Sequence, residues 1–327
     1  MKNLRKYFII VFLLLICLAV FVFLIFTLTK RKPEDKIQTE LSLVMNEVRK
    51  NHHRSQIPVY MVKKYGTLLI PYLQTYISDS NSFVRLEAKM NMLSIATDSN
   101  STSARQEIVY SLLKQIQNEN DGLNRQDVAS RLQGFVSADF TVESKEILKK
   151  LLLRDIEGKL GNLDDIERYI FLIVGIADMK SELPVLKEYI DKTMDSFNKA
   201  IKEKQRWDAH NTFMAIRASA RMGDKEGIKR CIDLVESVQN ENDKIALVRE
   251  LSYVRQPEVV EYLYSYLKMD KTPPSLGPDV LMGSYADYAM EGLKLMLKDF
   301  PVRGYEPNAV DKCRKWMAEQ KEWKIIR

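Results

Sequence analysis

Residues 79–95 read D-S-N-S-F-V-R-L-E-A-K-M-N-M-L-S-I, and this stretch decides the fold class. Its apolar residues Val84, Ala88 and Met92 recur at every fourth position, which places them on one face of an α-helix. Helical periodicity continues almost to the end of the chain, and the sustained period-two alternation that indicates strands is absent from the sequence. The sequence therefore predicts an all-α protein.

Turn residues divide the helical part of the chain into pairs. We expect six hairpins and one closing helix, over residues 66–77 and 82–96, 103–117 and 123–136, 143–153 and 163–179, 182–202 and 207–222, 225–238 and 243–254, 257–269 and 285–298, and 307–321. Apolar positions taken as equivalent in the second helices recur every 34 to 45 residues; they are Leu93, Leu132, Leu172, Met214, Val248 and Leu293. Such periods predict a two-helix solenoid, because one hairpin cannot bury its apolar face alone.

The same residues carry a resemblance to the HEAT repeats. Residues 79–95 fit the pattern D-x-x-x-x-V-R-x-x-A-x-x-x-M-x-x-I, although only this unit shows the full string. Residues 175–178 (G-I-A-D) and 251–260 resemble turns between HEAT repeats, and residues 304–316 are similar to the closing segment of bacterial HEAT-repeat proteins. The resemblance covers residues 60–320. It implies an α-solenoid of about six hairpins, with the second helices lining a concave face that binds protein or peptide partners.

An apolar segment of different character precedes the repeats. From Phe8 to Leu28 no residue is charged, and as a helix this run would rise roughly 31 Å, close to the hydrocarbon thickness of about 30 Å. A cleaved signal peptide is the alternative, but its apolar stretch is shorter and ends in small residues, whereas this run is followed by T-K-R-K at 29–32. We therefore predict a single-pass protein of a bacterial inner or plasma membrane, with the repeats outside the cytoplasm.

The predicted domain organisation has three parts. Residues 1–32 form the transmembrane helix with its basic flanks, residues 33–59 form a polar linker and a first amphipathic helix, and residues 60–327 form the repeat domain. The linker is P-E-D-K at 33–36, and the amphipathic helix follows from the spacing of apolar residues that begins at Leu41.

The charge balance argues against nucleic acid as a partner. The chain has 50 Lys and Arg against 44 Asp and Glu, and its formal net charge is +6. Six of the basic residues lie within the first 32 positions, which contain no acid, so the remainder of the chain is neutral. A nucleic-acid-binding domain needs an excess of basic charge on the domain itself.

Residues that would announce catalysis, a metal or a cofactor are scarce. Histidine occurs only at positions 52, 53 and 210, and the three cysteines at 17, 231 and 313 have no zinc or disulfide spacing. The G-x-S-x-G elbow and the glycine-rich phosphate loops are absent from the sequence. We predict no enzyme activity, no cofactor and no small-molecule ligand. Two alternatives stay open: an enzyme subunit resembling HEAT-like bilin lyase subunits, and a purely structural spacer of the cell envelope.

Basic residues of the second helices are the candidate binding residues. The predicted set is Arg85, Arg131, Arg168, Arg217, Arg221 and Arg249. On a concave face they would form a basic groove for an acidic peptide, but acids are interleaved with them, so a mixed solvated face is the alternative. Arg85 also resembles the arginine of a structural ladder that links neighbouring HEAT repeats, in which Asp79 is a candidate partner for an equivalent basic residue. The long interruption of helix at 270–278, with Pro273 and Pro274, is a second candidate contact for a partner.

Overall fold

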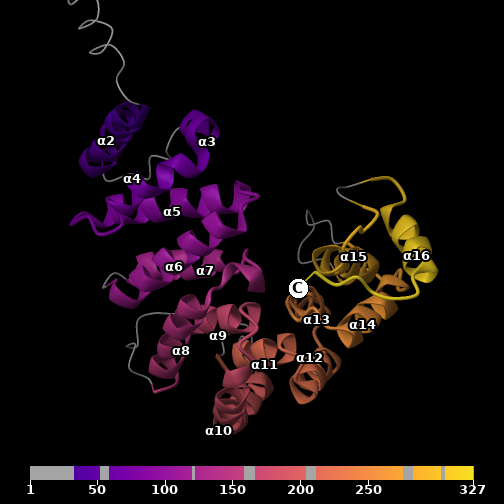
Figure 1. Cartoon of the computed structure of the whole chain (residues 1–327). Helices are drawn as coiled ribbons and strands as arrows, with labels where there is room; N and C mark the ends of the chain where they lie inside the picture. The colour runs from indigo at the N-terminus through magenta and orange to yellow at the C-terminus, as the bar shows by residue number, and fades with distance from the viewer. Residues whose placement is uncertain are drawn as a thin grey trace, which may run out of the picture. The chain divides into compact units, whose positions relative to one another are not determined.

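The computed structural model of the chain describes residues 33–51, 59–119, 122–157, 166–203, 211–274, 283–302 and 306–326. These residues form helices joined by turns, as Figure 1 shows, and the prediction of an all-α protein is confirmed. The β-type pairing found among them is an isolated antiparallel bridge between Leu297 and Ile325. The chain divides into two compact units, residues 1–95 and 96–327, and the domain boundary at 59/60 stays a prediction.

The first unit is built from short helices. It contains α2 (Pro33–Asn51), α3 (Val59–Tyr65), η1 (Gly66–Leu69), α4 (Ile70–Gln74) and most of α5 (Ser82–Asp98). Residues 33–36, predicted to be a linker, form the first turn of α2. Proline is favoured in the first turn of a helix because it lacks the backbone N–H that would have no partner there, and acidic side chains are favoured because they complement the helix dipole. Leu41 is buried, as the predicted amphipathic face requires.

The second unit contains the remaining helices. They are α6 (Thr102–Asn118), α7 (Gly122–Leu132), η2 (Ser137–Asp139), α8 (Val142–Ile156), α9 (Ile166–Ile176), η3 (Lys180–Glu182), α10 (Leu183–Lys202), α11 (Asn211–Arg221), α12 (Lys225–Ser237), α13 (Glu241–Glu250), η5 (Leu251–Tyr253), α14 (Pro257–Leu267), α15 (Tyr285–Met296) and α16 (Ala309–Glu319). Side-chain oxygens of Ser101, Thr141, Asp224, Asn240 and Ser284 accept backbone N–H groups and begin five of these helices. The predicted helix pairs fall on these elements with shifted ends.

Helices of the second unit also pack against the helix two positions further along the chain. Contacts join α6 with α8, α7 with α9, α9 with α11, α12 with α14, and α13 with α15. Helices α9 and α11 lie side by side in its centre (Figure 1), and residues 170–177 and 212–220 are buried throughout. Their close approach needs a glycine, because a Cβ atom at Gly175 would lie 2.9 Å from Ala218 Cα.

The prediction of a single-pass membrane protein is corrected here. No helix among the described residues is long and apolar enough to cross a membrane. The longest of them, the 20-residue α10, carries charged residues such as Lys187, Glu188 and Asp191, and charges at the centre of a bilayer are costly. The segment at 8–28, predicted as the anchor, lies outside the described residues.

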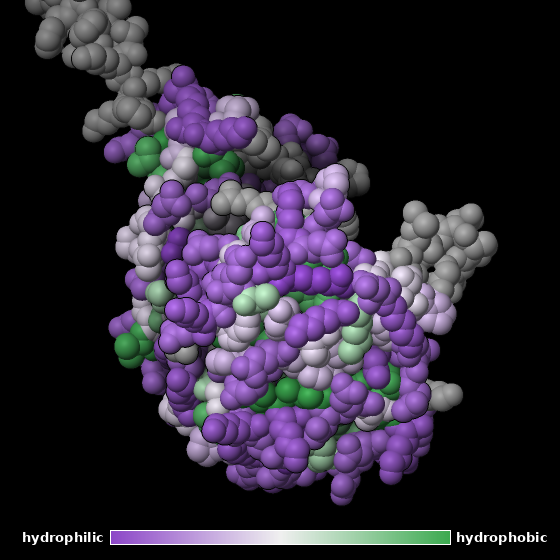
Figure 2. Space-filling model, turned by 90° about the vertical axis from the view of Figure 1, so that its right-hand side faces the viewer, coloured by the Kyte–Doolittle hydropathy of each residue, from purple (hydrophilic) through white to green (hydrophobic). Residues whose placement is uncertain are grey.

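The surface is mainly polar on the face that Figure 2 shows. Hydrophilic residues cover most of this face, and the hydrophobic residues gather in small separate patches. Large exposed apolar patches are what usually mark an apolar protein interface. Partner recognition through this face would therefore depend on polar and charged groups.

Cys231 and Cys313 of the second unit are buried, and we expect their thiols to be unreactive in the folded chain. Burial raises the pKa of the Cys231 thiol to about 12, and burial raises that of Cys313 to about 11. In a Cys17→Ser variant, we expect neither thiol to react with a disulfide reagent at pH 8 in the folded chain, because the thiolate is the reacting form. Both should react in guanidinium chloride.

The same shifts give a pH dependence of stability. The native state keeps both thiol protons up to about pH 11, whereas the unfolded chain loses them near pH 9, so these groups stabilise the fold below pH 9 and lose that contribution as pH rises to about 12. A Cys231→Ala, Cys313→Ala pair should show a smaller loss over that window in denaturant titrations. Rapid labelling of either thiol in the folded chain would contradict this account.

Candidate functional site

Three turns of the second unit, those after α9, α11 and η5, share one backbone feature. Asp178 follows α9, Gly223 follows α11 and Arg255 follows η5, with φ values of 53°, 92° and 52°. After α9 and α11 the next N–H returns to the carbonyl five residues earlier, Met179 to Val174 and Asp224 to Ser219, which is the Schellman ending of a helix. Because α9, α11 and η5 contact one another in series, their turns come together.

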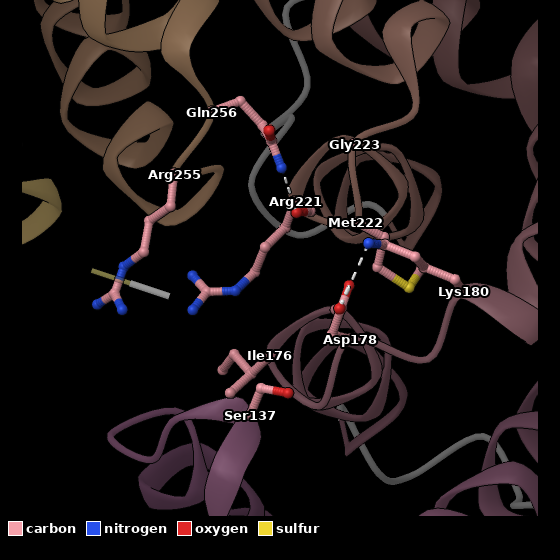
Figure 3. Close-up of a pocket in the computed structure, with 10 residues that line it drawn as sticks. Ser137, Ile176, Asp178, Lys180, Arg221, Met222, Gly223, Arg255 and Gln256 are labelled. Atoms are coloured by element: carbon pink, nitrogen blue, oxygen red, sulfur yellow. Dashed lines mark hydrogen bonds and ion pairs between the residues drawn. The ribbon is translucent and has the colours of Figure 1, made fainter. Parts of the chain in front are cut away.

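A cavity lies where these turns meet, and we name it the turn pocket (Figure 3). Its volume is about 260 Å³. The residues that line it are Ser137, Gly175, Ile176, Asp178, Lys180, Arg221, Met222, Gly223, Arg255 and Gln256. Every one of them belongs to the second unit, and most lie on the three turns or at the ends of the helices before them.

Tyr253 organises the basic residues beside the pocket. Its hydroxyl donates a hydrogen bond to the Leu172 carbonyl of α9, passing next to Gly175, which leaves room for it. The guanidinium carbons of Arg217 and Arg221 lie 4.8 and 4.9 Å from the centre of the Tyr253 ring. Such cation–π contacts hold both side chains in place.

Arg221 and Arg255 present their guanidinium groups to the turn pocket. Figure 3 shows both guanidinium groups on the same side of the view, away from Asp178 and Lys180, and the charge of Arg221 acts on Arg255. Arg221 Nη1 donates to the Tyr253 carbonyl at 2.5 Å, and Arg255 Nη1 donates to the Ile326 carbonyl at 3.2 Å. Gln256 Nε2 donates to the Arg221 carbonyl at 2.6 Å and fixes the start of α14 against the end of α11. Both arginines are thus anchored by neutral carbonyl groups.

The positive charge of the pocket is not balanced by carboxylates. Among the described residues neither Arg221 nor Arg255 forms an ion pair, and the acid that lines the pocket, Asp178, lies 3.5 Å from Lys180 Nζ. Three cations therefore face one carboxylate. Buried or half-buried charges normally pair, because an unpaired charge loses hydration without compensation.

The pKa values of the two arginines reflect this crowding. Burial, and to a smaller extent the positive charge of Arg221, lower the pKa of Arg255 to about 10. Burial also lowers the pKa of Arg221, and Arg217 adds to that effect, while Tyr253 and Asp178 oppose it. An anion in the pocket would relieve both effects by stabilising the charged forms.

Two of the six predicted arginines belong to this region, and only one reaches the pocket. Arg221 lines it. Arg217 is buried beside it, where it forms an ion pair with Glu250 and donates to the Glu250 carbonyl at 3.2 Å. The charge of Arg217 is therefore already paired with Glu250 within the chain.

The other predicted arginines do not line the pocket. Arg85 is in the first unit and donates to the carbonyls of Asp79 and Ser80, as a structural residue does. Arg168 lies over its neighbour Tyr169, 4.7 Å from the ring centre. Arg131 on α7 and Arg249 on α13 are exposed. A single basic groove formed by all six stays a prediction.

The predicted loop contact is only partly described. Pro273 is buried and Pro274 is exposed, and a partner contact at this loop stays a prediction. Residues 275–282 of the same interruption lie outside the described residues.

Sequence reasoning missed Lys180, Arg255 and Gln256 as site residues. The signal is present in the sequence, because residues 175–178 and 251–260 resemble turns between HEAT repeats. Turns of stacked hairpins lie along one edge, so cations on neighbouring turns meet in space. The sequence alone gives these turns a structural role and no ligand.

Comparison with known proteins adds no family or activity. No protein-family model, no curated protein and no solved structure matches the chain. The resemblance to HEAT repeats rests on residues of this chain alone and stays a prediction. The chemistry of the turn pocket is therefore the best guide to function. It supplies guanidinium and ammonium donors, which suit the binding of an oxyanion.

Proposed function

We propose that this chain is an α-solenoid of HEAT-like hairpins that binds a protein or peptide partner bearing an anionic group, without catalysing a reaction. Support for the solenoid comes from the order of contacts in the second unit, where helices two positions apart along the chain pack on one another. This pattern is what stacked hairpins produce, because each hairpin buries its apolar face against the next.

The excess of positive charge at the turn pocket is the observation that carries the binding proposal. Arg221 is held by the ring and the carbonyl group of Tyr253, and Arg255 is held by the Ile326 carbonyl. Among the described residues no carboxylate forms an ion pair with either arginine. Keeping two such cations together costs free energy that the fold alone does not recover. An anionic group of a partner would recover it, and a pre-arranged site loses little entropy on binding.

The alternative functions have less support. A bilin lyase subunit would need a reactive site for the pigment, and a spacer would need no charged pocket at all. Among the described residues no group of three His, Cys, Asp or Glu side chains could hold a metal ion. No described feature favours either alternative, so both stay predictions.

Partner capture with matched charge variants tests the proposal. We expect the chain, crosslinked in extracts of its own cells, to retain a stoichiometric protein partner. Arg221→Gln and Arg255→Gln should each reduce capture about tenfold or more, since removing one charge from a desolvated ion pair costs about 2 kcal/mol or more. Lys229→Gln removes a charge from an exposed position on α12 and should change nothing.

Two further variants separate the turn pocket from the predicted groove. Arg131→Gln and Arg249→Gln should leave capture unchanged, because both residues are exposed and neither lines the pocket. Loss of capture with these two variants, but not with the pocket variants, would replace the pocket by the groove. Capture of no stoichiometric partner would reject the binding function.

A further inference from the structure

The size of the turn pocket limits what can enter it. Its volume of about 260 Å³ lies below the roughly 300–1,000 Å³ of pockets that enclose whole small molecules. The Tyr253 ring is covered by Arg217 and Arg221, so it does not offer a face for stacking a base. The cavity suits the head group of one side chain.

The charge of the pocket distinguishes between anions. Asp178 offsets the charge of Lys180, which leaves the two guanidinium groups of Arg221 and Arg255. A carboxylate brings one negative charge, whereas a phosphomonoester carries about −1.5 to −2 at pH 7. The phosphomonoester therefore neutralises both arginines and the carboxylate only one.

The hydrogen-bond donors of the pocket agree with this choice. Each guanidinium group has five N–H donors in a fixed planar arrangement, and the described structure uses one nitrogen of each for a carbonyl group. Arg255 Nε is buried and has no hydrogen-bond partner among the described residues. Two forks of this kind side by side match the three acceptor oxygens of a phosphate group.

We propose that the turn pocket is a phosphate-binding site. In it, Arg221 and Arg255 donate hydrogen bonds to the phosphate group of a phosphorylated serine or threonine of the partner, and Lys180 adds a positive charge at the rim. This inference rests on the proposed function, because it names the group by which the partner is held. It adds a regulatory consequence: the partner binds only after a kinase has modified it.

Small probes test the site without knowledge of the partner. The purified chain is titrated calorimetrically, at low ionic strength, with inorganic phosphate, N-acetyl-phosphoserine amide and N-acetyl-aspartic amide. We expect both phosphates to bind at least about tenfold more tightly than the aspartate, because each charged contact is worth about 1.4 kcal/mol or more. Equal affinity for phosphate and aspartate would overturn the inference.

Variants place the binding in the pocket. Arg221→Gln and Arg255→Gln should each weaken phosphate binding about tenfold, and Lys180→Gln, whose side chain is 62% exposed, should weaken it severalfold without affecting folding. Thermal melts check that the arginine variants fold, and Lys229→Gln is the control. If all three pocket variants bound phosphate as tightly as the parent chain, the binding would be assigned to an adventitious contact elsewhere on the surface, and the proposed site would be rejected.

A pH comparison identifies the dianion as the preferred ligand. The second pKa of a phosphomonoester is about 6, so its affinity should fall severalfold between pH 7.5 and 5.5, while that of sulfate, which stays doubly charged, should hold. A parallel fall for sulfate would assign the change to the protein and contradict the proposal.

Phosphatase treatment separates this inference from the proposed function. Extracts treated with phosphatase should lose the captured partner, while extracts with inhibited phosphatase should keep it. Capture that survives the treatment, and still depends on Arg221 and Arg255, would leave the binding function standing and reject phosphate as the ligand. If no partner were captured but the phosphate probes still bound selectively, the phosphate site would stand and the partner-binding function would be rejected.

Discussion

Replacing Gly175 by alanine is expected to lower the free energy of unfolding by about 1–3 kcal/mol, the usual cost of overpacking a tight interior. The added Cβ atom would lie 2.9 Å from Ala218 Cα and would meet the Tyr253 hydroxyl. The neighbour that must move is backbone of a buried helix, which cannot yield easily. Denaturant unfolding followed by circular dichroism measures the loss.

Gly134→Ala is the matched control for this prediction. Its Cβ atom would contact only the Arg131 carbonyl at 3.4 Å, an ordinary packing distance. We expect a change within about 0.5 kcal/mol of the parent, as for most surface substitutions. Equal stability of the Gly175→Ala variant and the parent chain would show that α9 and α11 do not approach as closely as the structure requires.

The second large effect is expected at Arg217. Replacement by alanine removes the ion pair to Glu250 and leaves a cavity between Phe213 and Tyr253, where the guanidinium group now packs. We expect a loss of about 2–4 kcal/mol, because a large buried side chain is truncated and a charged partner is left alone. The Glu250 side chain is 43% exposed, so water compensates part of its charge and keeps the loss below that of a fully buried pair.

Arg217→Met shows which part of the interaction matters. Methionine restores most of the packing volume without the charge, and well-packed apolar residues often replace buried ion pairs at little cost. We expect this variant to regain more than half of the stability that the alanine variant loses in urea titrations. Equal losses in both variants would mean that the charge, and not the packing, holds Arg217 in place.

Much of the fold was predictable because the helices are amphipathic and their turns carry recognisable residues. Pro257 begins α14 and Asn240 caps α13, at turns that the sequence predicts. The sequence failed at residues 33–36, since proline and acids are as common in the first turn of a helix as in a linker. The predicted membrane location is also wrong for the described residues, because none of their helices is long and apolar enough to cross a membrane.

The candidate site was predictable only in part. Sequence spacing put Arg217 and Arg221 on one helix, but it gave no sign that Glu250 would pair with the first and leave the second facing a cavity. Both arginines lie over the ring of Tyr253, whose hydroxyl donates to the Leu172 carbonyl, 81 residues away in the chain. A contact between residues so far apart in the chain forms only in the tertiary structure, so no local sequence pattern predicts it.

The central claim is that Arg221 and Arg255 accept an anion from outside the chain. A crystal structure of the chain, grown free of other multivalent anions and then saturated with phosphate, tests it most directly. The account predicts tetrahedral density in the turn pocket, with phosphate oxygens about 2.7–3.0 Å from nitrogens of both guanidinium groups. An empty pocket at saturating phosphate, or both arginines paired with carboxylates of the chain itself, would contradict it.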